Sequence, residues 1–469
     1  MALDPAAGHS GFSHDSIRNL GYDWSKMSDP SVAARPPFKV YLPRTATDVA
    51  CAVREARELG QQLTIRGSGH SSNDLVLAEG GHILHLVNMS RLLAVDLTIP
   101  SVTVQAGAAL TAVDEQLAPL GLGLPVVGDH RDLTVGGFAS VGGVGPTSHC
   151  RGLFVDNIQA LEYVTPDGEI ATCSRDCNAE QLYKLLAGCG KYGIITAVTL
   201  DAISCDKGRE RLHNERRILL SMDAFLTHAL DRMAQPGAAR LQRGYWMDAG
   251  CRQVPLFGQW SDYIPVEDAW RWRWQRRLSI ASRRSLGRGL SQMPEQLARM
   301  SATSSLTALA LAPRCRTTRD VEQADDFVLD YSTGGPVRWF VAWPPLDHFD
   351  RTFRRLNALF CRYRATTGCF TYICILIQAI RSQYLGDKGD TAHSVIAVIC
   401  GVVPSRFTAG TMSRLVAEMD DICLEEGAFR YQHSPTSRDI KRLRHLDPNY
   451  RHRAPEDQPC NLPSEDADS

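Results

Sequence analysis

The segment from residue 121 to residue 152 carries nine glycines in 32 residues, and this density constrains the chain more than any other feature. Glycine is disfavoured inside regular elements. A high number of glycines between strands therefore indicates a backbone that closely approaches another group. A second small-residue segment, R-G-S-G-H-S, occupies residues 66–71 after a strand-like run at 62–65. Ser72 replaces the third glycine of the G-x-G-x-x-G fingerprint, which argues against a Rossmann domain.

Both small-residue segments are able to bind a diphosphate. Consecutive backbone N–H groups, unobstructed by side chains, form a concavity suited to that group. The first segment is 66–71, and the second begins with T-V-G-G at 134–137 and continues through Ser140 and three further glycines. Either loop alone is equally compatible with a tight turn. Two such loops in one domain favour a bound cofactor.

Length and charge exclude several classes of protein. The chain has 469 residues, with 51 Lys and Arg against 52 Asp and Glu, so two or three domains are expected. The balanced charge gives no electrostatic reason to expect nucleic acid or a membrane as a partner. The longest apolar stretch, 369–380, is shorter than the ~20 residues of a bilayer span and predicts a core segment. The N-terminus lacks the pattern of a secretion signal, so we expect a cytoplasmic protein.

The fourteen cysteines are scattered, and none is spaced C-x-x-C. A chain of this length builds a core without disulfides, so we expect reduced thiols. The closest pairs lack the partner spacing of a zinc site, and we expect no metal.

Local patterns predict the main elements. A capping box at 45–48 predicts a helix that Gly60 ends, and apolar spacing predicts further helices. The turn residues T-P-D-G at 165–168 predict a hairpin. The further helices are expected at 110–117, 178–186, 350–363 and 409–426, and strands at 193–200, 337–342 and 394–403.

Composition divides the chain. We expect a loosely attached arm at 1–34, a boundary after Cys205 and a disordered tail at 455–469. The run W-R-W-R-W-Q-R-R at 270–277 is open to two interpretations, a surface that stacks on nucleic-acid bases or a strand with one aromatic face. Its period of two favours the strand.

The motifs together resemble a known family. The segments R-G-x-G-H-S at 66–71, T-V-G-G at 134–137, D-N at 156–157, P-D-G-E at 166–169 and K-Y-G-I-I-T at 191–196 are similar to those of the vanillyl-alcohol oxidase superfamily of FAD enzymes. The nearest likeness is to cytokinin dehydrogenases and their bacterial relatives. The resemblance implies an α+β fold, with a PCMH-type FAD-binding domain of two subdomains at 35–205. It also implies an antiparallel-sheet substrate domain with helices at 206–425 and a C-terminal segment at 426–454 that returns to the FAD domain.

The resemblance also implies the residues that hold FAD. The family histidine that is joined to the 8α carbon of the flavin corresponds to His70. A neutral imidazole is a competent nucleophile for that bond, although a His70 that only hydrogen-bonds its loop stays an alternative. Asp132 stands where doubly attached relatives have cysteine, so one covalent bond is expected. The other implied contacts are Ile65, Gly67, Ser68, Gly69, Ser71, Asp129, Thr134, Gly137, Ser140, Val144, Ile195 and Tyr431.

Asp129 matches the family aspartate that accepts the substrate proton while hydride leaves for the flavin. A buried carboxylate of raised pKa is a usable base, but a turn aspartate that caps backbone is the alternative role. Two departures concern the substrate. Arg243 stands where plant cytokinin dehydrogenases carry a substrate-binding glutamate, and the usual P-G-Q ending is missing after Asp447-Pro448.

The resemblance therefore implies an FAD-linked oxidoreductase. It would take hydride from a C–H next to an amine or alcohol of a small molecule, with oxygen or a quinone as the acceptor. A tailoring oxidase of a larger biosynthetic intermediate is one alternative. A flavin-binding protein without turnover is another.

Overall fold

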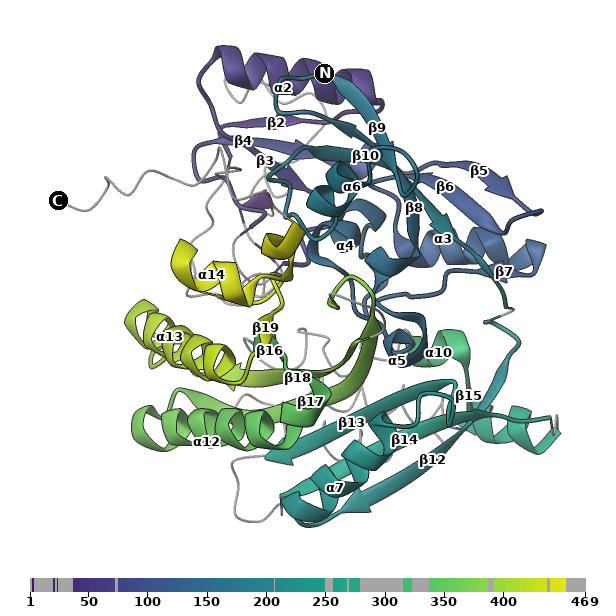
Figure 1. The fold of residues 1–469 in the computed structure, drawn as a ribbon, viewed down its shortest axis with the longest axis vertical. Helices are drawn as coiled ribbons and strands as arrows, with labels where there is room; N and C mark the ends of the chain where they lie inside the picture. Colours follow the sequence, from purple (N-terminus) through teal and green to yellow (C-terminus); the bar gives the residue numbers. More distant parts are fainter. Residues whose placement is uncertain are drawn as a thin grey trace.

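The computed structural model describes residues 2–3, 20–21, 23, 37–71, 75–205, 207–248, 256–267, 270–278, 315–322, 337–386, 391–436 and 439–452. These form an N-terminal region (37–205) and a C-terminal region (207–452), which pack against each other (Figure 1). The tail predicted to be disordered, 455–469, lies outside the described residues.

The first sheet of the N-terminal region is built around helix α2 (Ala46–Glu58). The predicted capping box is confirmed: Thr45 Oγ1 accepts from Asp48 N at 3.2 Å, and the Asp48 carboxylate accepts from Thr45 N at 3.0 Å. Three strands of this sheet are parallel and β1 is antiparallel. Their order is β1 (Ala2–Leu3), β2 (Lys39–Tyr41), β4 (His82–His85) and β3 (Leu63–Arg66).

The described residues of the N-terminal arm are attached to this sheet. Ala2 and Leu3 pair with β2, and Leu20 is buried against Val40 and Ile83. These contacts place the described residues of the arm against the sheet, and the extent of a loosely attached arm at 1–34 stays a prediction.

The second sheet of the N-terminal region is antiparallel throughout. The predicted turn at 165–168 joins two of its strands, with Gly168 at φ +84°. Its strand order is β5 (Leu92–Asp96), β6 (Ser101–Gln105), β10 (Ile194–Asp201), β8 (Ile158–Val164) and β9 (Ile170–Ser174), and the helices near it are α3 (Leu110–Leu117), α4 (Val135–Val141), α5 (Ser148–Arg151) and α6 (Ala179–Leu185). A short pair, β7 (Leu122–Gly123) with β11 (Ile203–Ser204), leads towards the C-terminal region.

The C-terminal region is built on an eight-stranded antiparallel sheet, here called the cap sheet. The apolar stretch at 369–380 lies largely in its long central strand β17, as a core segment rather than a membrane span. The strand order is β15 (Cys315–Thr317), β12 (Arg211–Leu219), β14 (Phe257–Pro265), β13 (Leu241–Asp248), β17 (Phe370–Ser382), β18 (Thr391–Val402), β16 (Val337–Trp343) and β19 (Phe429–Arg430).

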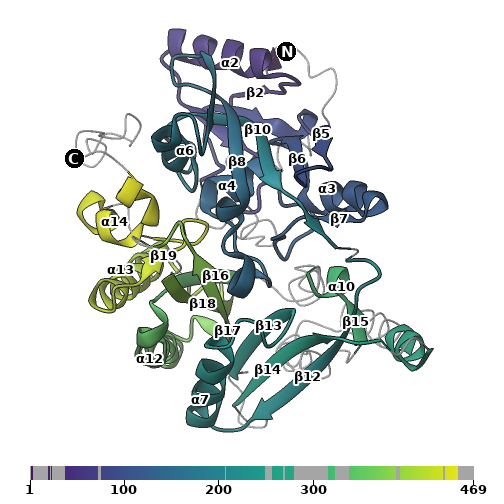
Figure 2. The same cartoon turned by 45° about the vertical axis from the view of Figure 1, so that its right-hand side comes forward.

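The two faces of the cap sheet meet different partners. Side chains alternate along a strand, so Tyr245 and Met247 join the core of the N-terminal region, while Trp246 joins the core formed with the helices. Figures 1 and 2 show those helices on the face turned away from the N-terminal region. They are α7 (Met222–Met233), α12 (Phe349–Thr367) and α13 (Ala409–Glu425), and α10 (Thr318–Glu322) and α14 (Ile440–Leu446) lie nearer the junction. The predicted α+β class and antiparallel cap are confirmed.

The tryptophan and arginine run is helical at 270–278, so its assignment to a strand is wrong. Helical spacing brings Trp272 and Arg276 to one face. The Trp272 indole donates to Leu212 O at 3.0 Å, and the Arg276 guanidinium lies 5.8 Å from the Trp272 ring and pairs with Asp320 at 2.6 Å. Trp270 and Trp274 are exposed, so the run has no single aromatic face of period two.

Among the described helices, none has the length and apolar character that a membrane crossing requires.

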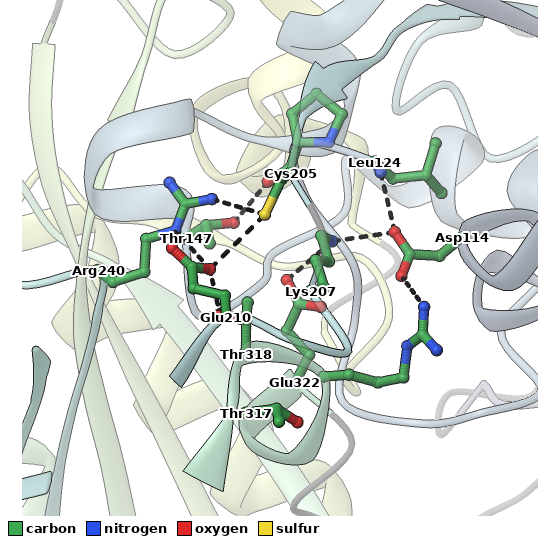
Figure 3. Close-up of polar contacts among 12 residues, drawn as sticks. Asp114, Leu124, Thr147, Cys205, Lys207, Glu210, Arg240, Thr317, Thr318 and Glu322 are labelled. Carbon is green, nitrogen blue, oxygen red and sulfur yellow. Dashed lines mark hydrogen bonds and ion pairs between the residues drawn. The ribbon is translucent and has the colours of Figure 1, made fainter. Parts of the chain in front are cut away.

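A buried group of charges, here called the linker cluster, joins the two regions where the chain passes between them (Figure 3). Lys207 Nζ lies 3.2 Å from Asp114 Oδ1 of α3 and 3.0 Å from Glu322 Oε1 of α10, and all three residues are almost fully buried. Arg319 Nη2 lies 3.5 Å from the second oxygen of Asp114. One ammonium group is thus shared by carboxylates from both regions.

Charge balance sets the protonation of the linker cluster. Burial lowers the pKa of Lys207, but the carboxylates of Glu322 and Asp114 outweigh burial and leave that pKa raised. Burial raises the pKa of Glu322 to about 7, against the opposing effect of Lys207. We therefore assign Lys207 as a cation at neutral pH.

Lys207→Met should destabilise the protein by ~3–5 kcal/mol, because removal of one partner leaves buried carboxylates uncompensated. Denaturant unfolding measures the loss. Arg57→Met is the control, since the Arg57–Asp167 pair is 64% and 72% exposed and should contribute about 0–1 kcal/mol. A Lys207→Met loss no larger than that of Arg57→Met would contradict the role of the cluster.

Candidate functional site

The two glycine loops of the sequence meet in the structure. Strand β3 ends at Arg66 and releases the first loop, in which a Cβ added to Gly67 would lie 2.2 Å from Thr134 Oγ1 of the second loop. Gly69 has φ +83°, and a Cβ there would lie 2.2 Å from the Arg66 guanidinium. Ser68 and Ser71, also predicted contacts, are half-buried in the same loop. The side chain of Thr134 thus explains the glycine at position 67, and the positive φ explains the glycine at position 69.

The second loop is fixed by the start of α4. Thr134 caps this helix, and its Oγ1 accepts from Gly137 N at 3.3 Å. Gly136 N donates to Ala106 O at 2.7 Å, which docks the loop on the end of β6. Ser140 Oγ donates to Gly136 O at 2.7 Å. Three predicted contact residues, Thr134, Gly137 and Ser140, therefore lie within helix α4 and its cap.

A third loop, 186–190, reaches the same place and was not singled out from the sequence. Ala187 and Cys189 have φ of 53° and 52°, which is costly for residues other than glycine. Their N–H groups donate to Ala139 O and Ser140 O, both at 2.9 Å. The signal in the sequence is G-C-G at 188–190, directly after the helix expected at 178–186. Strain of this kind concentrates at functional sites.

The C-terminal segment supports the third loop. Asn449 Nδ2 donates to Leu186 O at 2.8 Å and to Lys184 O at 3.1 Å, and the Tyr384 hydroxyl donates to Leu186 O at 2.8 Å. Residues after α14 thus contact the N-terminal region.

A cluster of histidines lies beside the first loop. The rings of His70 and His130 are 5.0 Å apart, and His433 of the C-terminal segment contributes to the electrostatics of His70. Burial lowers the pKa of His70 to about 3, with smaller effects from His130, His433 and Arg66. Burial likewise lowers the pKa of His433 to about 4. His70 is therefore a neutral imidazole at working pH.

Aromatic side chains of the C-terminal region complete this cluster. Tyr431 stacks on Trp343 at 4.7 Å and on His433 at 5.4 Å. Burial raises the pKa of Tyr431, while hydrogen bonds from the backbone of Gly143 and Val144 oppose that rise. The predicted contacts Tyr431 and Val144 are thereby brought together.

The isoleucines among the predicted contacts belong to the core. Ile65 lies in β3 and packs against the same hydrophobic cluster that contains Ile195. Ile195 is buried in β10 opposite Tyr163, so it lies in a strand of the second sheet rather than in a glycine loop.

Asp129 pairs with Arg243 across the junction of the two regions. Asp129 Oδ1 accepts from Arg243 Nη2, and the Arg243 side chain is 4% exposed against 19% for Asp129. Arg243 lies in β13 on the face of the cap sheet turned towards the N-terminal region. Sequence reasoning had singled out both residues but had not predicted that they pair, because they are 114 positions apart. The next residue, His130, is the one whose ring contacts His70.

Comparisons with known proteins agree with this geometry. Residues 37–174 match the family model described as "FAD binding domain". The chain is similar to an uncharacterized oxidoreductase of the fasciation locus of Rhodococcoides fascians, at 36% identity over 36% of this chain and 38% of the relative. It is 32% identical to an L-gulonolactone oxidase of Mus musculus, over 36% of this chain and 38% of the relative. It is 31% identical to cytokinin dehydrogenase 1 of Arabidopsis thaliana, over 39% of this chain and 32% of the relative.

The matches span less than two-fifths of the length of each of these relatives. The residues matched by the family model, 37–174, include both glycine loops. Residues 37–174 are therefore similar in sequence to an FAD-binding domain.

Proposed function

We propose that this protein is an FAD-dependent oxidoreductase that takes hydride from a C–H next to an alcohol or amine of a small molecule. FAD would be joined covalently to His70, Asp129 would accept the proton, and oxygen or a quinone would be the final electron acceptor. The observation that carries the proposal is the contact of Gly67 with Thr134, with His70 three residues away.

The residues around this contact fit an FAD group. Gly67 and Gly69 lie where a Cβ would collide with a neighbour. Consecutive residues without side chains can present backbone N–H groups to a diphosphate. Ser68, Ser71 and Ser140 add hydroxyls, and Tyr431 and Val144 bring apolar and aromatic surface. The neutral imidazole of His70 suits bond formation to the 8α carbon of the flavin ring.

Bound FAD supplies the hydride acceptor. The chain's own contribution is a positioned base: a carboxylate oxygen of Asp129 removes the O–H or N–H proton of the substrate. Arg243 pairs with this carboxylate and fixes its orientation. The face of the cap sheet that carries Arg243 would lie over the reacting carbon and limit its contact with water.

A second candidate is a flavin-binding protein without turnover. The ion pair of Asp129 with Arg243 favours this second candidate, because the guanidinium already donates to Asp129 Oδ1, an oxygen that would otherwise accept the substrate proton. Anaerobic addition of amines, alcohols and sugars separates the two. Bleaching of the flavin absorbance supports the oxidoreductase, and retained colour with every compound supports the binding protein.

Gly67→Ala should lower the FAD content of the purified protein, because the new methyl group would force the two loops apart at a cost of ~1–3 kcal/mol. Thr134→Ala in the same chain removes the colliding oxygen and should restore part of the content. Gly237→Ala is the control, since nothing lies within 4 Å of its added Cβ. Absorbance of bound flavin per protein is the measurement. Unchanged FAD content in Gly67→Ala would refute the close approach.

His70→Ala should convert covalent FAD into dissociable FAD. After acid precipitation the yellow colour should stay in the wild-type pellet and move to the supernatant of the variant. His130→Ala removes the neighbouring ring and should leave the colour in the pellet. Wild-type colour in the supernatant would remove the covalent bond from the proposal.

Asp129→Asn should lower the rate of anaerobic flavin reduction by ~10²–10⁴, the usual contribution of a positioned base. The flavin spectrum should stay near normal. Asp132→Asn, an exposed change in the same loop, should leave the rate within twofold. A loss of less than threefold in Asp129→Asn would make Asp129 a structural residue.

A further inference from the structure

Three large apolar side chains form an exposed stripe on the helix at 270–278, here called the tryptophan helix. Trp270 is 73% exposed, Trp274 is 61% exposed and Leu278 is 50% exposed. Their spacing of four residues places them on one face of the helix, on successive turns. Single exposed apolar residues are ordinary on a protein surface, but a contiguous group of them indicates a surface that binds a partner.

The opposite face of the tryptophan helix is anchored to the C-terminal region. The Trp272 indole is buried and donates to Leu212 O of β12 at 3.0 Å, and Arg276 pairs with Asp320 of α10 at 2.6 Å. Figures 1 and 2 show the helix at the edge of the molecule, beyond the end of β15. The fold therefore holds the helix by one face and leaves the stripe on the other.

Arginines border the stripe on both sides. On a helical projection Arg273 and Arg277 lie along one border and Arg271 lies along the other. All three side chains are exposed, and no carboxylate among the described residues is paired with them. The helix has four arginines and no acidic residue, and Asp320 neutralises Arg276, which leaves three exposed positive charges.

The local charge differs from that of the whole chain, which has 51 Lys and Arg against 52 Asp and Glu. Between Ala269 and Pro294 the sequence has seven arginines and no acidic residue. The tryptophan helix is the described part of this stretch. The balanced net charge therefore conceals a local excess that attracts an anionic partner.

Three kinds of partner differ in what they offer this surface. A second copy of the chain, related by a twofold axis, would place the same arginines opposite one another and repel. A single-stranded nucleic acid offers bases to Trp270 and Trp274 and phosphates to the arginines, but no apolar group to Leu278.

An anionic bilayer surface offers a match to every part. Acyl chains cover the whole stripe, including Leu278, and lipid phosphates lie along both of its borders. Indole rings favour the boundary between acyl chains and headgroups, and long arginine side chains extend from an apolar face to reach the phosphates.

We propose that the tryptophan helix binds the surface of a bilayer that contains anionic phospholipid. The helix lies in the plane of the interface, with Trp270, Trp274 and Leu278 among the upper acyl chains and the exposed arginines at the phosphates. The protein is thereby held at a membrane surface through one short helix, by an attachment that weakens as the salt concentration rises. This proposal goes beyond the proposed oxidoreductase activity and does not depend on it.

The test uses the purified full chain and two kinds of vesicle, one of phosphatidylcholine with phosphatidylglycerol in equal parts and one of phosphatidylcholine alone. Flotation measures binding. The chain should bind the phosphatidylcholine vesicles at least ~10-fold more weakly, because each arginine near an anionic surface contributes about fivefold in affinity. Equal binding to both kinds of vesicle, or binding to neither, would overturn the proposal.

Trp270→Ala combined with Trp274→Ala should weaken binding to the mixed vesicles at least ~10-fold, since two indoles no longer leave water. The matched control is Ile218→Ala combined with Leu220→Ala, which removes side chains that are 50% and 74% exposed at the end of β12 far from Leu212. The control should bind as the wild type does. Both variants should keep the flavin content of the wild type, which shows that they fold. Undiminished binding of the tryptophan variant, or an equal loss in the control, would contradict the role of the stripe.

Arg273→Gln combined with Arg277→Gln should also weaken binding to the mixed vesicles, by ~10-fold or more. Arg44→Gln combined with Arg217→Gln removes two exposed arginines elsewhere and should have little effect. Equal losses in the two variants would mean that net charge alone attracts the vesicles, and the tryptophan helix would not be the binding surface.

Insertion of the indoles is measured separately. Phosphatidylcholine brominated on its acyl chains, mixed into the anionic vesicles, should quench part of the tryptophan fluorescence of the wild type. The variant without Trp270 and Trp274 should lose that quenching, and unchanged quenching in this variant would overturn the proposed orientation.

The other partners are decided with the same tryptophan variant. Oligothymidylate that binds the wild type, but not the variant, in the absence of vesicle binding would replace the bilayer with nucleic acid. A dimer in sedimentation that the same two substitutions dissociate would replace it with a second copy. Either result would overturn the proposal.

Discussion

The site depends on one close approach, that of the backbone at Gly67 to the side chain of Thr134. Because residue 67 is a glycine and has no Cβ, the loop after strand β3 contacts the loop before helix α4. Strand β3 and helix α4 belong to different parts of the N-terminal region. The strained loop at 186–190 then hydrogen-bonds to α4, and the C-terminal segment fixes that loop through Asn449. Four segments far apart in the sequence therefore converge on the place where His70 lies.

Local chemistry explains which features were predictable from the sequence. The helix at 46–58 follows from a capping box, and the turn at 165–168 follows from proline and glycine, because each depends on residues within four positions. The loops at 66–71 and 134–137 were recognisable because short motifs carry them. The prediction for the run at 270–278 was wrong. Its alternation of period two suggests a strand, whereas in the structure Trp272 and Arg276 interact at helical i, i+4 spacing.

Contacts between distant segments were not predictable. The pair of Asp129 with Arg243, the stacking of Tyr431 on Trp343 and the shared ammonium group of Lys207 each join residues that only the tertiary structure brings together. Each of these contacts includes a residue of the C-terminal region. The contacts of Arg243 and Lys207 cross the junction between the two regions, and the stacking of Tyr431 on Trp343 lies within the C-terminal region. The motifs that carry the family likeness lie in the N-terminal region. The fold of that region was therefore easier to predict than the side-chain chemistry of the cap sheet.

The alternation of β17 also bears on how such a cap changes during evolution. Its register is already shifted once, between Phe370 and Tyr372, before the strand reaches Gln378. One inserted or deleted residue after that shift would turn Gln378 towards α12 and bring an isoleucine or alanine to the opposite side. A change of one residue in length within the strand would therefore exchange the side chains of both faces at once, whereas a change in the connections at its ends would leave both faces in place.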